Sequence, residues 1–578
     1  MNYLPLPGEW GLNNIIIMQK IVDNLVKYSL VILFFSLPIV NSHFFDLLWI
    51  KSGFYVNWNY EFTKVMFFNI FLWIIFVFFI IQKLIEKILY KKKYQNIIIP
   101  KILYLLIWII LISTFFSDFF YTSLLWNASK SHGMIMFINL IWMFVIFINS
   151  SKKFKKQLIK TSLLSLFFVT IIWIKEYYYP TFDYWDLSNR AFSTFWHPNY
   201  LALFILILVP FLIDKIKQNY IYLILFILSV FCLFLTKSAW WIIIFLIYFI
   251  FLKIPSIPSP LRRGLGWGFI ILLILFFSKF WLTTKLHSFL SRFFIWETTI
   301  KIIFSDIKNI VVWAGLWTLS YIFDSFKSSY LYIFENFWFT ADRPHNLLLN
   351  IFYHFWILWL FFIVNLFIKI FKYYKISENK YKIYYESIFL FLLFTIFNFA
   401  SISHYLIIIL VWSFIYNKSK GNSKYKLSKY FSIISIIIVS IFWVYFNTKY
   451  YIEEHKLYTN SSYISNNILY NKIKSENYEQ NLFWNNFTNI QDMCQDLILY
   501  SNSVENNFYC WNLLWEIDKN LSKEYYKKWL NKTPDLWNTD SKYNNNFLIK
   551  NFVDKKRFYS KKYSDLEEIL KRSWIKIN

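Results

Sequence analysis

Residues 65–81, VMFFNIFLWIIFVFFII, form an almost unbroken apolar run. A helix needs about 20 mostly apolar residues to cross a bilayer, and this run with its flanks is long enough. A second run of the same character, YFSIISIIIVSIFWVYF, occupies 430–446. Neither run alternates polar and apolar residues as the strands of a membrane barrel would. The pattern predicts an all-α polytopic membrane protein.

The composition agrees with this class. Of the 578 residues, 58% are hydrophobic and only 16% are charged, whereas a soluble chain of this length would carry far more charge. We expect about 13 transmembrane helices, each with an uncertainty of about 2–4 residues at its ends. The predicted spans are 27–41, 62–82, 102–117, 133–149, 158–174, 198–213, 219–235, 239–252, 267–283, 347–368, 386–399, 402–416 and 430–446.

Basic residues alternate between the predicted loops. One set of loops contains 26 Lys and Arg residues, in the stretches 83–101, 152–160, 215–217, 253–263, 369–382 and 418–429. The short loops of the other set contain Lys51, Lys130, Lys175, Arg190 and Lys237. Basic loops stay in the cytoplasm, so we expect a cytoplasmic N-terminus and an extracytoplasmic C-terminus. The net charge of +27 is then mostly a topology signal, and nucleic acid is not an expected partner.

Two larger regions are predicted to lie outside the cytoplasm. A transmembrane domain of 1–446 contains a long loop at about 284–346, and a mostly helical soluble domain follows at 447–578. Within the loop, SRFFIWETTIKIIF (291–304) repeats its apolar residues at helical intervals, which predicts an amphipathic helix on the membrane face. Cys494 and Cys510 lie in the tail, where either a disulfide or two free thiols is possible.

Three arginines occur in the predicted outer loops. They are Arg190, Arg292 and Arg343, whereas Lys supplies nearly all other positive charge there. Arginine offers a planar fork of donors that fits phosphate and pyrophosphate. These residues are therefore candidates for holding a lipid pyrophosphate at headgroup level and stabilising its departing charge. The alternative, which we weigh equally on chemistry alone, is that they anchor spans at the interface.

Histidines accompany these arginines. His345 and Asn346 follow Arg343 directly before an apolar run, and His197 precedes Pro198 at the start of another. An imidazole titrates near neutral pH, so His345 could deprotonate an acceptor hydroxyl. Local capping is the alternative for His345 and Asn346, and a helix-start role is the favoured interpretation of His197.

Several stretches resemble the O-antigen ligase family, which includes O-antigen polymerases and some protein O-oligosaccharyltransferases. FSLPIVNSHFFDLLWIK (35–51) is similar to the family's first span and loop, and ISTFFSDFFYTSLLWNASKSHG (112–133) to its Ser-Asp segment. NRAFSTFWHPNYLA (189–202) resembles its Arg…Thr-Phe…Pro-Asn motif. RFFIW (292–296) and RPHNLLLNIFYHFWILWL (343–360) resemble its long-loop Arg…Trp pair and Arg-x-His-Asn motif.

The resemblance implies a membrane glycosyltransferase. Such an enzyme moves an undecaprenyl-pyrophosphate-linked glycan to an acceptor hydroxyl on the outer face of the bacterial cytoplasmic membrane. Carried over by motif, Arg190 and Arg292 bind the donor pyrophosphate, and His345 and Arg343 are catalytic. The acceptor can be a lipid A core, another glycan or a protein, and the family needs no cofactor or metal.

Supporting roles are expected for neighbouring residues in the same motifs, namely His197, Asn199, Trp296 and Asn346. The partners implied are the lipid-linked glycan donor, the acceptor glycolipid or protein, and the bilayer. The competing hypothesis is a transporter or flippase for lipid-linked sugars or ions. Such proteins place ionisable residues within the bilayer and break their helices with Gly or Pro, and the predicted spans contain almost no charge near their centres.

Overall fold

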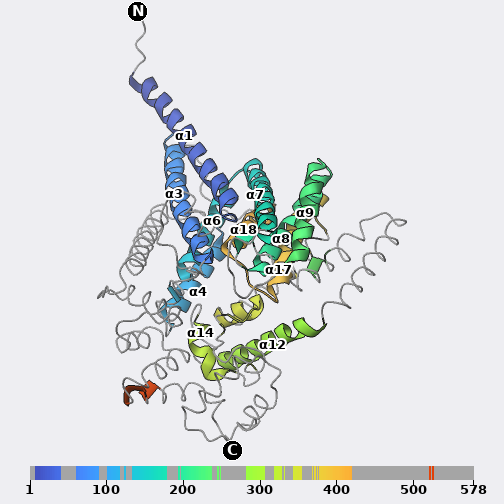
Figure 1. The fold of residues 1–578 in the computed structure, drawn as a ribbon. Helices are drawn as coiled ribbons and strands as arrows, with labels where there is room; N and C mark the ends of the chain where they lie inside the picture. The colour runs from blue at the N-terminus through green and yellow to red at the C-terminus, as the bar shows by residue number, and fades with distance from the viewer. Residues whose placement is uncertain are drawn as a thin grey trace, which may run out of the picture. The chain divides into compact units, whose positions relative to one another are not determined.

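A computed structural model of the chain describes most of the predicted helices. The described residues are 7–40, 60–89, 100–117, 123–124, 133–178, 193–195, 197–236, 244–245, 248, 282–305, 318–327, 331, 341, 343–354, 368, 370, 372, 374, 376–418, 520–522 and 524–525. Every regular element in these ranges is a helix, so the all-α class is confirmed for this part of the chain (Figure 1). Most of the predicted spans 239–252 and 267–283 lies outside the described residues, as do the whole span 430–446, both tail cysteines and nearly all of 447–578.

The chain divides into two compact units, which we describe separately. Unit 1 comprises Met1–Leu111, Ser129–Lys253 and Phe362–Thr459, and unit 2 comprises Ile112–Ala128, Ile254–Phe361 and Asn460–Asn578. Helices of unit 1 are α1 Pro7–Ser36, α3 Tyr60–Leu89, α6 Met134–Asn149, α7 Lys152–Tyr178, η1 Ser193–Phe195, α8 Pro198–Ile216, α9 Ile221–Leu235, α17 Asn379–Thr395 and α18 Ile402–Lys418. Unit 2 contains α12 Leu282–Phe304, α14 Leu319–Ile322, η4 Phe323–Phe326 and a helical stretch at 347–354, while α4 Lys101–Phe115 crosses the division.

Most predicted helices are present, and the first one differs from its prediction. The sequence predicts a span at 27–41, whereas α1 begins at Pro7 and ends at Ser36. Proline at 38 explains the early end, because it lacks an N–H group and disfavours helical backbone in the residue before it. A hydrogen-bonded turn follows, in which Ile39 and Val40 donate to the Ser36 carbonyl.

Contacts at the two ends of three unit 1 helices show that α8 and α18 run in the same direction and that α17 runs opposite to both. At one end, Tyr200 in the first turn of α8 contacts His404 in the first turn of α18. At the other end, Phe211 near the end of α8 packs on Tyr384 near the start of α17. Tyr384 also stacks on Phe414 near the end of α18, with ring centroids 4.4 Å apart. These relative directions are the ones that the loop charges predict for the three helices.

Two described helices, Lys152–Lys175 and Pro198–Ile216, are long and apolar enough to cross a membrane by length and composition. Shorter apolar helices accompany them at Phe67–Lys83, Leu103–Phe115, Met134–Asn149, Ile221–Leu235 and Ile402–Tyr416. The full number of about 13 spans stays a prediction.

Apolar side chains also cover the outside of these helices. Ile221, Ile224, Ile227, Phe231 and Phe234 are all exposed along one face of α9. Similar exposed stripes follow α1, at Ile17, Ile21, Leu25, Tyr28 and Ile32, and α7, at Leu164, Phe168 and Ile171. Exposed apolar area of this extent marks a surface that contacts something apolar.

Polar side chains, by contrast, are buried between the helices of unit 1. Asn139 of α6 donates to the side-chain carbonyl of Asn69 on α3 at 3.1 Å, and both residues are buried. Ser387 of α17 donates to the Ile207 carbonyl at 2.7 Å. Hydrogen bonds between side chains and neighbouring helices thus join the helices internally.

Lys64 is a fully buried lysine of unit 1, with 0% of the residue exposed. Its Nζ donates to the carbonyls of Leu37 at 3.0 Å and Pro38 at 2.8 Å, just beyond the end of α1. Carbonyls at a helix C-terminus have no partner within the helix and favour a positive charge. The ammonium also lies 4.8 Å from the centroid of the Phe195 ring, where a cation is attracted to the ring face.

Replacing Lys64 should therefore destabilise the fold. In Lys64→Ala, two buried carbonyls lose their charged donor, which we expect to cost about 3 kcal/mol. Thermal unfolding of the purified chain, followed by tryptophan fluorescence, should show a melting temperature lower by several degrees. Lys83→Ala is the matched control, since Lys83 lies on the same helix and pairs with Glu86 at 2.7 Å near the surface. Equal melting temperatures for the two variants would contradict the structural role of Lys64.

Candidate functional site

The segment 193–200 connects several helices of unit 1. Ser193 has a positive φ of 51°, a backbone region that few residues other than glycine adopt. Its hydroxyl donates to the Val169 carbonyl of α7 at 2.9 Å, and the Thr194 hydroxyl donates to the Pro38 carbonyl. The Pro38 carbonyl therefore accepts hydrogen bonds from both Thr194 and Lys64, which engages both of its lone pairs.

His197 and Asn199 begin α8 within the same segment. The Nδ1 atom of His197 accepts the backbone N–H of Asn199 at 3.1 Å, and Pro198 occupies the first helical position. This arrangement caps the helix, because the first N–H groups have no partner inside it. The helix-start interpretation of His197 is confirmed. Asn199 is buried, and its side chain donates to that of Asn398 at 2.9 Å.

His404 lies beside this segment and is completely buried. Its Nδ1 accepts the backbone N–H of Ser401 at 2.9 Å, so in the neutral ring the proton is on Nε2. Nε2 then donates to the Tyr200 carbonyl at 2.8 Å. With both ring nitrogens engaged and a tautomer set by its neighbours, His404 joins α18 to α8 and is not placed to accept a proton.

Unit 2 contains a separate apolar core around α12. Ile295, Ile302 and Ile303 of α12 pack with Phe323 and Tyr353, together with Leu319, Leu331 and Ala341. On the opposite face of α12, Phe293, Ile300 and Phe304 are exposed. The helix predicted at 291–304 is confirmed as the second half of α12, and its exposed face is largely apolar. Arg292 and Trp296 lie on this helix and are half-buried.

The Arg-x-His-Asn motif forms the junction between Ala341 and the helical stretch 347–354 of the same core. Arg343 is nearly buried, with 4% of its side chain exposed. His345 has a positive φ of 54°, which is uncommon for any side chain with a Cβ atom. Asn346 caps the following helix, since its Oδ1 accepts the backbone N–H of Leu349 at 3.0 Å. The junction thus holds Arg343 and His345 in a constrained backbone.

Two further hydrogen bonds fasten this helical stretch within unit 2. The Ser113 hydroxyl, from the predicted Ser-Asp segment, donates to the His354 carbonyl at 3.2 Å. The hydroxyls of Thr318 and Tyr353 lie 2.9 Å apart and are both buried. Three of the stretches that carry the family resemblance therefore contribute to unit 2, namely 112–128, 292–296 and 343–360, whereas 35–51 and 189–202 belong to unit 1.

The predicted site residues fall into two groups. Arg292, Trp296, Arg343, His345 and Asn346 belong to unit 2, in the segments that build its core. His197 and Asn199 belong to unit 1. Arg190 lies outside the described residues. A convergence of all three arginines with His345 therefore stays a prediction.

Sequence reasoning missed two residues near the 193–200 segment. Lys64 directly precedes the apolar run 65–81, and a charge at that position was a signal of a buried polar contact. Asn398 lies in the short connection between α17 and α18, where a polar side chain gave little information by itself. Only the fold places Lys64 against Phe195, and Asn398 against Asn199.

No known family model, curated protein or solved structure matches this chain. Within the described residues, no group of three or more His, Cys, Asp or Glu side chains is placed to hold a metal ion. The class that the structure supports is accordingly an all-α protein with candidate membrane-spanning helices.

The backbone at position 345 provides a test of the constrained junction. A β-branched residue tolerates a positive φ poorly, whereas glycine adopts it freely. We expect His345→Val to be less stable than His345→Gly by about 1–2 kcal/mol. Thermal unfolding of the two purified variants measures the difference, and a valine variant as stable as the glycine variant would show that position 345 is not constrained.

Proposed function

We propose that this protein is a membrane glycosyltransferase of the O-antigen ligase type. It transfers an undecaprenyl-pyrophosphate-linked glycan to an acceptor hydroxyl outside the cytoplasmic membrane. The observation that carries the proposal is the backbone at His345, two residues after the nearly buried Arg343. Sparsely populated backbone conformations persist where the surrounding structure enforces them, and they cluster at functional sites.

The second positive φ supports the same interpretation. Among the described residues other than glycine, positive φ occurs at Ser193 and His345. Each lies in a motif on which the family resemblance rests, 189–202 or 343–360. Local propensity does not favour this conformation at serine, so tertiary contacts such as the Ser193–Val169 hydrogen bond hold it.

The proposed chemistry assigns a role to each charged group. As the family motifs imply, Arg190 and Arg292 bind the pyrophosphate of the donor, and Arg343 stabilises its developing charge. His345 accepts the proton of the acceptor hydroxyl as its oxygen bonds to the anomeric carbon of the donor sugar. The bond from that carbon to the phosphate oxygen breaks, and undecaprenyl pyrophosphate leaves with the electron pair.

The apolar surface of unit 1 fits contact with the lipid tails of a bilayer. The exposed apolar stripes on α1, α7 and α9 would contact lipid tails, while buried pairs such as Asn69–Asn139 face the helix bundle. Transfer to a lipid environment removes the cost of leaving such stripes in water. This distribution supports the membrane location on which the proposed reaction depends.

The competing transporter hypothesis rests on ionisable groups near the middle of the bilayer. In the described part of unit 1, the buried lysines and glutamate are Lys64, Lys155 and Glu386. The two lysines lie near helix ends, which does not favour ion coupling at the membrane midplane. Glu386 lies in the middle of α17 and accepts hydrogen bonds from the hydroxyls of Tyr248 at 2.8 Å and Tyr374 at 3.3 Å. Glycan-independent flux through liposomes containing the purified chain would support the transporter instead.

Sidedness can be measured independently of activity. In a background with Cys232, Cys494 and Cys510 replaced by serine, Lys301→Cys and Lys153→Cys each introduce one exposed thiol. Our topology places residue 301 outside and residue 153 in the cytoplasm. An impermeant maleimide added to intact cells should label the first variant. It should label the second variant only after the cells are lysed. The reverse pattern would invert the topology and exclude the proposed reaction.

Transfer activity tests the assigned residues. We expect His345→Asn, which tolerates a positive φ, to lower transfer by about 10²–10⁴-fold through loss of the base. Arg292→Lys should lower it about 10²-fold, because an ammonium cannot replace the guanidinium fork. The assay uses the purified chain, a synthetic undecaprenyl-pyrophosphate glycan and separate lipid A core, glycan and protein acceptors, with products identified by mass spectrometry.

Lys301→Ala is the control for the arginine variant. Lys301 lies on the same helix as Arg292, is 45% exposed and pairs with Glu297 at 3.1 Å on the surface. Its replacement should leave transfer within about twofold of the unaltered chain, because exposed ion pairs contribute little. Full transfer by both His345→Asn and Arg292→Lys would end the assignment.

A further inference from the structure

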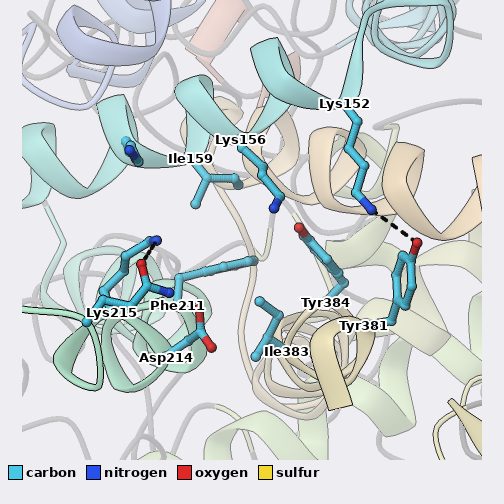
Figure 2. Close-up of a pocket in the computed structure, with 11 residues that line it drawn as sticks. Lys152, Lys156, Ile159, Phe211, Asp214, Lys215, Tyr381, Ile383 and Tyr384 are labelled. Carbon is cyan, nitrogen blue, oxygen red and sulfur yellow. Dashed lines mark hydrogen bonds between the residues drawn. The ribbon is translucent and has the colours of Figure 1, made fainter. Parts of the chain in front are cut away.

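A cavity of about 260 Å³ lies in unit 1 where one end each of α7, α8 and α17 meet. Lys152, Lys156 and Lys160 line it from successive turns of α7. The end of α8 and the residues beyond it contribute Phe211, Asp214, Lys215 and Gln218, and α17 contributes Tyr381, Ile383 and Tyr384, while Ile159 of α7 completes the lining. Figure 2 shows the tips of Lys156 and Tyr384 pointing toward one another across the cavity.

The lining carries four lysines against one aspartate, so it is strongly positive. Two of the lysines are already engaged: the Lys152 Nζ donates to the Tyr381 hydroxyl at 3.1 Å, and Lys215 donates to Gln218 (Figure 2). The ammonium groups of Lys156 and Lys160 have no hydrogen-bond or ion-pair partner among the described residues. Four positive charges opposed by one carboxylate repel one another, and a bound anion would relieve this repulsion.

The wall opposite the lysines is apolar with a hydroxyl edge. Phe211 packs on Tyr384, with ring centroids 5.7 Å apart. Burial raises the pKa of the Tyr384 phenol above its ordinary value, and the charge of Asp214 adds to this effect. Tyr384 therefore keeps its proton at neutral pH and can donate a hydrogen bond to an anion.

The neighbouring Lys155, on the same helix, has its ammonium group engaged by other parts of the protein. It is buried, its Nζ donates to the Ser413 carbonyl at 3.1 Å, and it lies 4.6 Å from the centroid of the Phe414 ring. Lys156 and Lys160, in contrast, are exposed side chains at the cavity. The two sets of lysines on α7 thus differ in function: Lys155 joins helices, whereas the cavity lysines face an open space.

The position of the cavity points to a ligand at the membrane surface. It lies at the end of the unit 1 helices away from Tyr200 and His404, where the chain enters the basic loops predicted to be cytoplasmic. The cytoplasmic leaflet carries anionic lipids, and basic pockets between helices at this level bind their headgroups. A volume of about 260 Å³ is below the usual range for a drug-sized ligand, and it suits a single phosphate group with its glycerol.

We propose that this cavity binds the phosphate group of an anionic phospholipid of the cytoplasmic leaflet. Lys156 and Lys160 bind the phosphate oxygens, Tyr384 donates a hydrogen bond, and Phe211 and Ile159 contact the apolar part of the lipid. The carboxylate of Asp214 repels an anion. The phosphate group must therefore lie beside the lysines and away from Asp214. The site is separate from the proposed transfer reaction, and its test does not depend on that reaction.

The experiment compares lipid binding by two charge-matched variants of the full chain. Lys156→Gln/Lys160→Gln removes two cavity lysines, and Lys153→Gln/Lys217→Gln removes two exposed lysines close by that do not line the cavity. Native mass spectrometry of the detergent-purified chain, titrated with phosphatidylglycerol or phosphatidylcholine, gives the affinities. A parallel titration with inorganic phosphate tests the free anion as the source of the phosphate group.

We expect the cavity variant to bind phosphatidylglycerol at least about tenfold more weakly, and the control variant to stay within about twofold of the unaltered chain. Phosphatidylcholine should bind more weakly to all three proteins, because its headgroup has no net charge. An equal loss in both variants would show a diffuse surface charge and overturn the proposal. Saturable binding of inorganic phosphate without preference for phosphatidylglycerol would also overturn it, because the ligand would then be the free anion.

Discussion

A single buried ammonium group joins three separate parts of unit 1. Lys64 of α3 donates to two carbonyls at the end of α1 and lies over the ring of Phe195 in the 193–200 segment. A buried charge is costly unless hydrogen bonds and opposing dipoles surround it, so this contact requires all three parts to be in position together. The end of α1, the start of α3 and the 193–200 segment consequently form one polar assembly inside an apolar bundle.

The same constraint recurs at other helix ends of unit 1. His404, Asn199 and Asn398 join α18, α8 and the end of α17, while Lys155 joins α7 to α18 at the opposite end of the bundle. Polar contacts collect at helix ends because carbonyl and N–H groups without intrahelical partners are available there. Lys156 and Lys160 differ from these residues, because they line a cavity and form part of the lipid site that we propose.

The sequence predicted the helical class and most helix positions of the described part of the chain well. Long apolar runs and alternating basic loops are local signals, because each depends on residues close together in the chain. The early end of α1 at Ser36 was missed, although Pro38 was visible, because the apolar run continues past the proline. In the candidate site, the helix in the second half of α12 and the capping role of His197 were predictable, whereas the partners of Lys64 and Asn398 were not.

The sequence by itself determined which segments are helical, which loops are basic and which motifs carry arginine and histidine, since these follow from composition and spacing along the chain. Only the tertiary structure decided the backbone of Ser193 and His345, the burial of Arg343 and the grouping of lysines from α7 and α8 around one cavity. The physical reason is that a positive φ at a residue other than glycine is unfavourable locally and persists only under contacts from distant segments. Burial and electrostatic proximity likewise depend on residues that are far apart in the chain and meet only after folding.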